Sequence, residues 1–337
     1  MTHSFPQHGI ALAPMRHLTQ GPFWQILNQY GAPDAYVSEF VRVHENFTLN
    51  PRQIEDNLAY ADKCPLWIQL MGNDPDALLK NAEILQKYPI AGIDFNVGCP
   101  VPKIYKKQAG GGLLRDLPLL KTLIGSLRAG CSKPLSVKMR IGFEHTENFE
   151  KILDILYEAQ VDCITIHART VKDRYEGQIR YDFIRCAVEK LPIPIIANGD
   201  INTLDDIKHV LSFTRCWGTM LGRAAIRNPW IFAQWRNHSK GYPMDYPRYK
   251  HVFEYLQQID KTFKLNRSAD PLGLLKNFCK YLGPAIDADG DFLRQILKSS
   301  TEFEFWIKCE QGLLKGLQGE KIFRGEVVQI GEIFKAL

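Results

Sequence analysis

The stretch Gly92-Ile93-Asp94-Phe95-Asn96-Val97-Gly98-Cys99-Pro100 joins a short run typical of a buried strand to a tight loop that carries a thiol. In parallel α/β folds, the C-terminal ends of the strands are where ligands bind and chemistry takes place. Cys99 is therefore a candidate reagent. The alternative is a small hydrophobic side chain in a turn, which is the commoner fate of a cysteine taken at random.

The same unit, a short β-rich run that ends in a polar loop, recurs along the first 225 residues and alternates with longer amphipathic stretches. The predicted strands cover residues 10–13, 35–38, 66–69, 92–95, 135–138, 163–167, 194–197 and 218–221. The stretches between them that predict helices include 75–88, 117–129, 146–160 and 204–212. Eight strands with eight crossovers match the count of a (β/α)₈ barrel.

A doubly wound open sheet has the same alternation of strands and helices. The residues that follow each strand distinguish the two folds. Polar or conformationally special residues close all the predicted strands: Pro14-Met15, Glu39, Gln69, Asn96, Lys138, His167, Asn198 and Gly222. In a barrel these ends converge on one face, whereas an open sheet scatters half of them. We therefore predict an α/β fold, a (β/α)₈ TIM barrel whose loops build one pocket.

The pattern changes after Arg223 and reaches a polar, proline-rich joint at Gly241-Tyr242-Pro243-Met244-Asp245-Tyr246-Pro247. Beyond this joint there is no strong strand signal, and helices are predicted over residues 249–264, 272–282, 290–299 and 303–314. We expect a catalytic barrel domain over residues 1–245 and a small all-helical domain over residues 246–337.

Composition bounds the class of protein. The chain of 337 residues is 45% hydrophobic and 23% charged, enough to bury a full core, and its net charge of +5 does not by itself indicate a nucleic-acid-binding protein. No segment has the uninterrupted apolar length of a membrane span, and we expect a cytoplasmic protein. The eight cysteines include no C-x-x-C pair and none has a histidine at zinc-ligand spacing, so neither a metal site nor a disulfide framework is expected.

Barrels often bind phosphate at the loops after strands seven and eight. Asn198-Gly199-Asp200 and Gly222-Arg223 occupy these two places. The glycines let backbone N–H groups approach an anion, and Arg223 can add charge-assisted hydrogen bonds. We expect a phosphorylated cofactor or substrate there, against the alternative of ordinary turns.

Other strand ends suit a planar, electron-accepting ring. Gln69 can hydrogen-bond the donor and acceptor edges of a flavin, and Lys138 can place a positive charge near the ring atoms that become anionic on reduction. Pro14-Met15 would cover one face of the ring. His167 ends another apolar strand and is a further candidate, although a core histidine satisfied by one hydrogen bond is the alternative.

Taken together, these motifs resemble those of the tRNA-dihydrouridine synthases, over roughly residues 10–235. The N-x-G-C-P motif, followed by Lys103 and the Gly110-Gly111-Gly112 turn, is the most specific part of the resemblance. The other matching stretches are Ala13-Pro14-Met15, Ser38-Glu39-Phe40-Val41-Arg42, Val137-Lys138-Met139-Arg140-Ile141-Gly142, His167-Ala168-Arg169-Thr170, Asn198-Gly199-Asp200 and Gly222-Arg223.

The resemblance implies an FMN enzyme that reduces a uridine in the D-loop of tRNA to 5,6-dihydrouridine, with NADPH re-reducing the flavin. A hydride passes from flavin N5 to C6 of the uracil, and Cys99 is the general acid that protonates C5. A thiol with an ordinary pKa of about 8.5 is mostly protonated at neutral pH and can therefore donate.

The resemblance also implies RNA contacts, because the target base has to leave its stack to reach the flavin. Asn96 and Arg140 would bind the uracil edge or a flanking phosphate. Backbone phosphates would be bound by Arg42, Lys103, Lys106, Lys107 and Arg169, and by the helical domain with Lys276, Lys280, Arg294 and Lys298. Stretches typical of two bacterial branches are present; position 16 is slightly favoured. We expect a monomer.

Two other functions are compatible with the motifs. One is an FMN barrel that reduces a free small molecule, against which the lysine-rich loop and the helical domain argue. The other is a tRNA-binding or remodelling protein without catalysis, against which the presence of Cys99, Lys138 and Arg223 argues.

Overall fold

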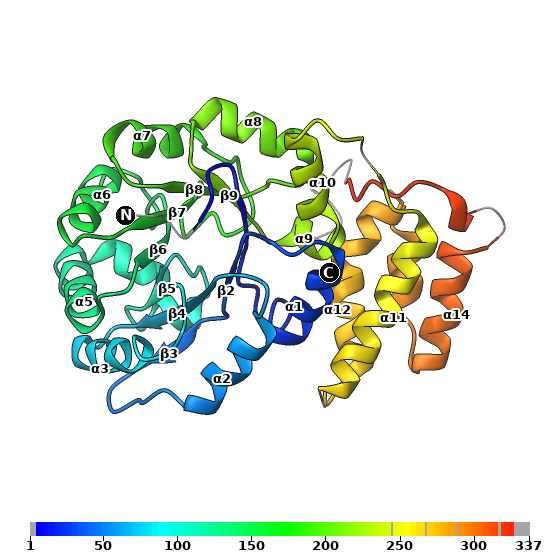
Figure 1. The fold of residues 1–337 in the computed structure, drawn as a ribbon, viewed down its shortest axis with the longest axis horizontal. Coiled ribbons are helices and arrows are strands. Elements are labelled where there is room, and N and C mark those ends of the chain that lie inside the picture. Colours follow the sequence, from blue (N-terminus) through cyan, green and yellow to red (C-terminus); the bar gives the residue numbers. More distant parts are fainter. Residues whose placement is uncertain (1–4, 244, 267, 288, 316–317, 327–337) are drawn as a thin grey trace. The chain divides into compact units, whose positions relative to one another are not determined.

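The structure is a computed structural model that describes residues 5–243, 245–266, 268–287, 289–315 and 318–326 (Figure 1). The described chain forms two compact units. The first unit contains residues 5–21, 33–201 and 205–221, and the second contains residues 22–32, 202–204 and 222–326, apart from the gaps given above.

The first unit is a closed parallel barrel. Its strands are β1 (Ile10–Leu12), β2 (Ala35–Val37), β4 (Leu66–Gly72), β5 (Gly92–Val97), β6 (Leu135–Arg140), β7 (Cys163–His167), β8 (Ile195–Asn198) and β9 (Gly218–Leu221). They are hydrogen-bonded in the order β2-β1-β9-β8-β7-β6-β5-β4, and the pairing of β2 with β4 closes the ring. This closure confirms the predicted TIM barrel, because an open sheet has two unpaired edges.

A ninth strand, β3 (Val41–Val43), was not predicted. It pairs with β4 beyond the end of β2, with Val41 opposite Leu70, whereas in β2 Tyr36 lies opposite Leu66. The register therefore slips by one residue between β2 and β3, as in a β-bulge. Ser38 bridges the interruption, because its N–H donates to Trp67 O (2.9 Å) and its Oγ accepts from Gln69 N (2.9 Å).

Helices follow the strands around the barrel (Figure 1). They are α2 (Pro51–Tyr60), α3 (Pro75–Leu85), α4 (Pro102–Tyr105), α5 (Leu117–Gly130), α6 (Phe149–Glu158), α7 (Asp182–Lys190) and α8 (Leu204–Thr214), with a 3₁₀ helix, η1 (Gly110–Arg115), between α4 and α5. Their starts follow local rules: Asp74 and Asp116 accept hydrogen bonds from the first turns of α3 and α5, and a proline lies at the start of both helices.

Two groups of buried side chains belong to the barrel unit. One is apolar and contains Phe5, Ala11, Ala13, Ala35, Val37, Trp67, Ile196 and Met220. The other is polar and buried, with Gln69, Asp94, Asn96 and Ser136 on the neighbouring strands β4, β5 and β6. A buried polar group costs free energy unless it is hydrogen-bonded, so these polar side chains require partners inside the barrel.

The second unit is helical in its described part. It contains α1 (Gly21–Tyr30), α9 (Arg223–Arg227), α10 (Ile231–Ser239), α11 (Tyr249–Leu265), α12 (Pro271–Ile286), α13 (Asp291–Leu297), α14 (Glu302–Leu313) and the 3₁₀ helix η2 (Gln318–Glu320). All the helices predicted after residue 245 are present. The predicted boundary at residue 245 lies inside this unit, which also takes in α1, α9 and α10.

Aromatic packing explains why the second unit recruits α1. Phe23 of α1 lies against Phe278 of α12, with ring centroids 5.5 Å apart, and Tyr30 packs edge-on against Trp230 (4.9 Å) and Tyr255 (5.8 Å). These contacts join parts of the chain at least 200 residues apart, so no local pattern in the sequence could predict them. Among the described residues, no helix combines the length and hydropathy needed to cross a membrane.

Candidate active site at the carboxyl ends of the strands

Cys99 lies in a loop that is held by hydrogen bonds on both sides. Asn96, in β5, turns its Oδ1 back to accept from the backbone N–H groups of Gly98 (3.1 Å) and Cys99 (3.0 Å). On the other side, the N–H of Gly111 donates to the carbonyl of Cys99 (3.1 Å). Asparagine favours such turns because its short side chain can reach the backbone two or three residues ahead. The thiol-bearing residue is therefore fixed through its own main chain.

The glycine turn of η1 packs directly against Cys99. Gly110 has a φ of +54°, in the left-handed region, and a Cβ at this position would lie 2.8 Å from Cys99 Cβ. The same cluster contains the buried Met71, Ile104 and Ala109. The Gly110-Gly111-Gly112 turn thus has a physical role next to the thiol, because a side chain there would displace Cys99.

The surroundings of Cys99 favour the protonated thiol. Burial raises the pKa of Cys99 above its ordinary value, although the N–H of Val101 and the cations Arg140, Lys138 and Arg16 act in the opposite direction. A nucleophilic cysteine requires the thiolate, whereas a proton donor requires the thiol. The balance at Cys99 therefore suits proton donation at neutral pH.

A series of hydrogen bonds between buried side chains holds Asn96 in place. Asn96 Nδ2 donates to Gln69 Oε1 (2.9 Å), and Gln69 Nε2 donates to Asp94 Oδ2 (2.7 Å). Ser136 Oγ donates to the other carboxylate oxygen, Asp94 Oδ1 (2.5 Å). Gln69 and Asp94 are 0% and 1% exposed. Gln69 thus uses both ends of its amide inside the protein, and the flavin contact expected for it stays a prediction.

Lys138 of β6 and Asn198 of β8 are hydrogen-bonded to each other, although β7 lies between their strands. Lys138 Nζ donates to Asn198 Oδ1 (3.0 Å), and Asn198 Nδ2 donates to Met220 O (2.7 Å). Burial and repulsion by Arg140 lower the pKa of Lys138 to about 8, with Asp94 and Cys99 acting the other way. The structure thus brings together two of the predicted cofactor-binding residues, and the charges of Lys138 and Cys99 influence each other.

Gly199 continues this site on the loop after β8. Its φ is +115°, and a Cβ here would lie 2.6 Å from Ile179 Cδ1 and 3.2 Å from His167 Nε2. His167 is buried at the end of β7. Pro14 and Met15 are partly buried after β1, where Met15 N donates to Thr19 Oγ1 (2.6 Å). These predicted residues all lie at strand ends on the same side of the barrel.

Arg140 and Arg169 bind the loop that follows β7. Arg140 Nη1 donates to the carbonyls of Thr170 (2.7 Å) and Arg174 (2.5 Å). Arg169 donates to Gly177 O and forms an ion pair with Asp200 (2.5 Å). The two side chains are only 3% and 4% exposed. In this structure they hold the loop, and the RNA contacts expected of them remain predictions.

The remaining predicted residues lie elsewhere. Arg42 on β3 and Lys103 on α4 are exposed, as are Lys106 and Lys107 after α4. Gly222 and Arg223 belong to the second unit, at the start of α9, so their predicted part in a phosphate site stays a prediction. Lys276 of α12 donates to Ser299 O.

Sequence reasoning missed two groups near the site. Asp94 lies between Ile93 and Phe95, and Ser136 lies between Leu135 and Val137; a polar residue between two apolar strand residues was a usable signal. Tyr175 is 61% exposed on the loop after β7, with Arg140 Cζ 5.4 Å from its ring centroid and the His167 ring edge-on at 6.4 Å. Its place depends on how the loop folds, which no local pattern indicates.

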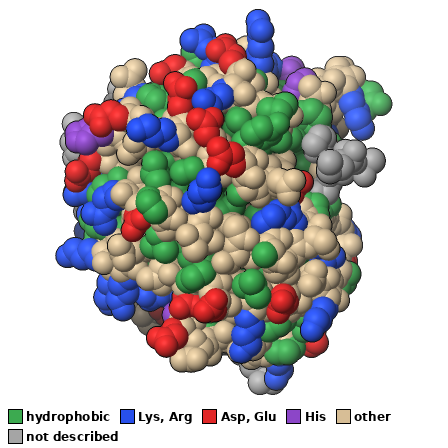
Figure 2. Space-filling model, turned by 90° about the vertical axis from the view of Figure 1, so that its left-hand side faces the viewer, with side chains coloured by type: hydrophobic (Ala, Val, Ile, Leu, Met, Phe, Trp, Pro, Cys, Tyr) green, Lys and Arg blue, Asp and Glu red, His purple; other side chains and the backbone are tan. Residues whose placement is uncertain are grey.

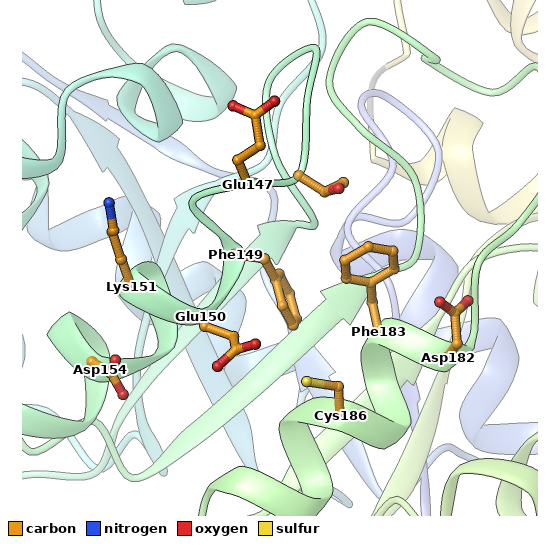
Figure 3. A pocket seen from close by; sticks show the side chains of 9 residues that line it. Glu147, Phe149, Glu150, Lys151, Asp154, Asp182, Phe183 and Cys186 are labelled. Atoms are coloured by element: carbon orange, nitrogen blue, oxygen red, sulfur yellow. The ribbon is translucent and has the colours of Figure 1, made fainter.

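The outer surface of the barrel differs from the strand ends. Figure 2 shows acidic and basic side chains interspersed over one face, with no field of a single charge. A surface pocket of about 650 Å³ lies between the first turns of α6 and α7. Figure 3 shows its carboxylates, Cys186 and the rings of Phe149 and Phe183, which pack edge-on with centroids 5.1 Å apart. None of the predicted site residues lines it.

The fold and the site define a (β/α)₈ barrel with a cysteine at its carboxyl face, where burial raises the pKa of the thiol. The family model for "Dihydrouridine synthase (Dus)" matches residues 11–280, and the chain belongs to this family. "tRNA-dihydrouridine synthase B" of Pasteurella multocida is 35% identical over 225 residues, which cover 66% of this chain and 67% of that protein. "tRNA-dihydrouridine(16) synthase" of Neisseria meningitidis is 31% identical over 321 residues, covering 88% of this chain and 94% of that protein.

The glycine turn gives a test of the packing around Cys99. We expect Gly110→Ala to lower the free energy of unfolding by about 2 kcal/mol, because the left-handed conformation and the close contact with Cys99 both oppose a Cβ. The measurement is urea unfolding followed by circular dichroism.

Gly125→Ala is the matched control, because Gly125 lies inside α5 and a Cβ there meets nothing within 4 Å. This variant is expected to be more stable than the wild type by about 0.5–1 kcal/mol. Equal stability of the two variants would contradict the packing described for Gly110.

Proposed function

We propose that this protein reduces a uridine of tRNA to 5,6-dihydrouridine, with FMN as its cofactor and NADPH as the reductant. The observation that carries the proposal is the Cys99 thiol, fixed by Asn96 and Gly111 at the end of β5 and kept protonated by its burial. Membership of the dihydrouridine synthase family and the names of the relatives support it.

The residues at the strand ends fit a phosphorylated flavin. Lys138 offers an ammonium, and Gly199 keeps the loop after β8 free of a side chain. Arg169, for which a tRNA phosphate contact is predicted, has an Nη1 that is buried without a hydrogen-bond partner among the described residues, so this donor remains available for an anionic ligand. When bound, FMN supplies the hydride that is added to C6 of the uracil.

Cys99 completes the reduction as general acid. Addition of hydride at C6 leaves an electron pair delocalised over C5 and O4, and the proton needed at C5 comes from Sγ of Cys99. The Sγ–H bond breaks as the C5–H bond forms, and the thiolate then regains a proton from solvent. The cations Lys138 and Arg140 favour the transient thiolate, because they lower the free energy of a negative charge at Sγ.

Replacement of the thiol tests this role. Cys99→Ala is expected to keep its flavin, measured by absorbance near 450 nm, and to lose activity by about 10²–10⁴-fold, the usual contribution of general acid catalysis. The assay is dihydrouridine formed on unmodified tRNA, quantified by mass spectrometry. Cys131→Ala is the control, because Cys131 is buried at the far end of α5. Undiminished turnover of Cys99→Ala would exclude Cys99 as the acid.

The pH dependence should follow Lys138. Its pKa is lowered to about 8, so its positive charge is present below that pH and is lost as the pH rises. We expect kcat/KM to fall above about pH 8 while the Cys99 thiol, whose pKa is raised, still carries its proton. Lys138→Met should be less active and lack this decrease. A decrease at the same pH in the variant would rule out Lys138 as its source.

The tRNA is expected to contact the lysines after Cys99. Lys103, Lys106 and Lys107 are exposed within eight residues of the thiol. Replacing all three by glutamine should weaken tRNA binding and reduce the slope of log Kd against log salt by about 2–3, since each phosphate contact contributes nearly one unit. The control replaces Lys63, Lys87 and Lys133, which precede β4, β5 and β6 at the opposite end of the barrel. Equal slopes in both variants would contradict this contact.

The modified position is proposed as 16. The relative from Neisseria meningitidis that carries this position in its name matches along 88% of the chain, including most of the helical unit. We also propose that the protein acts as a cytoplasmic monomer, with residues 246–337 contributing to tRNA binding.

A further inference from the structure

We infer that Asp94 is a positioning residue for Cys99, acting through Gln69 and Asn96. This inference rests on the proposed function. Asp94 does not touch Cys99; it fixes the direction of two amide groups that end at the main chain of the Cys99 loop. The hydrogen bonds run from Gly98 and Cys99 to Asn96, from Asn96 to Gln69, and from Gln69 to Asp94.

The hydrogen bonds between the Cys99 loop and Asp94 all run in one donor-to-acceptor direction. An amide presents an acceptor oxygen at one end and donor N–H groups at the other, so a buried amide can be reversed unless its neighbours dictate its direction. At one end of the chain, the backbone N–H groups of Gly98 and Cys99 require an acceptor. At the other end, Asp94 Oδ2 accepts from Gln69 Nε2 while Asp94 Oδ1 accepts from Ser136 Oγ, so the carboxyl group of Asp94 faces the nitrogen of Gln69.

These two end groups together determine the orientation of both amides, Gln69 and Asn96. With Gln69 Nε2 on Asp94, its Oε1 faces Asn96, which must present Nδ2. Asn96 Oδ1 is then left for the N–H groups of the loop. If Gln69 reversed, Asn96 would have to follow, and its Nδ2 would face two backbone donors. The loop would lose both hydrogen bonds that precede the thiol.

The position of Asp94 is not explained by stability alone. It lies on β5 and is 1% exposed, where an aliphatic residue would bury more favourably. Burial raises its pKa, whereas hydrogen bonds from Ser136 and Gln69 and the charge of Lys138 lower it. Burying this acidic group costs free energy of folding. We attribute its presence to its role in orienting the amides of Gln69 and Asn96.

Three variants separate positioning from folding. Asp94→Val removes the acceptor and frees Gln69 to reverse. Gln69→Met interrupts the chain one step later at similar size. Asp94→Asn keeps the shape, and it can keep the polarity too, because the Ser136 hydroxyl can turn to accept from the new NH₂ while the amide oxygen still accepts from Gln69.

The first measurement is hydrogen exchange of the flavin-loaded protein, resolved to the amides of Gly98 and Cys99. Asp94→Val and Gln69→Met should speed exchange at these amides by about tenfold, the effect of losing one net hydrogen bond, with α5 unchanged. Asp94→Asn should stay within about threefold of the wild type. Thr219→Val is the control, since Thr219 is fully buried on β9 and its hydroxyl has no partner among the described residues.

The second measurement is kinetic. Asp94→Val and Gln69→Met should lower kcat for dihydrouridine formation by about tenfold or more with KM for tRNA nearly unchanged, because a misplaced acid affects the reaction and not the RNA contacts. Asp94→Asn should recover most of kcat.

Two results would overturn the inference: unchanged exchange at Gly98 and Cys99 in Asp94→Val, or an Asp94→Asn variant that is as impaired as Asp94→Val. Failure of the proposed function gives a different result, because wild-type protein would then form no dihydrouridine while the exchange pattern of the variants still changed as described.

Discussion

The pairing of β2 with β4 is the constraint on which the site depends, since it turns a row of parallel strands into a closed ring. Closure directs every strand end to one face, so residues as distant in sequence as Cys99, Lys138 and Asn198 become neighbours. The slip of register between β2 and β3 accompanies this closure. At this slip, Ser38 Oγ takes the place of a main-chain acceptor for the N–H of Gln69. The bulge is therefore connected to the hydrogen-bonded amides that lead to Cys99.

The chemistry of the site follows from competition between burial and charge. Burial disfavours the thiolate of Cys99, whereas Lys138 and Arg140 favour it, and burial prevails in the structure. The same burial lowers the pKa of Lys138, so the two groups influence each other. A thiol that remains protonated, but whose anion is tolerated next to cations, has the properties of an acid that must give up a proton and recover it in each cycle.

Much of the fold was accessible from the sequence, because strand and helix patterns and the polar strand ends are local. Cys99 was identified for the same reason: its loop follows a buried strand directly. What could not be predicted depends on distant contacts. The aromatic packing of Phe23 and Tyr30 gathers α1 into the second unit, and the carbonyls that bind Arg140 come from a loop 30 residues further on. Asp94 was visible as a polar residue in an apolar strand, but its partners were not.

Whether this chain makes dihydrouridine in tRNA is best tested by comparing tRNA from otherwise identical cells with and without the gene. Sequence-resolved mass spectrometry of individual tRNAs reports each dihydrouridine by its added mass of two hydrogens. We expect that one position of the tRNA, proposed as position 16 of the D-loop, is uridine without the gene and dihydrouridine again when the gene is restored. An unchanged dihydrouridine pattern in both strains would contradict the claim.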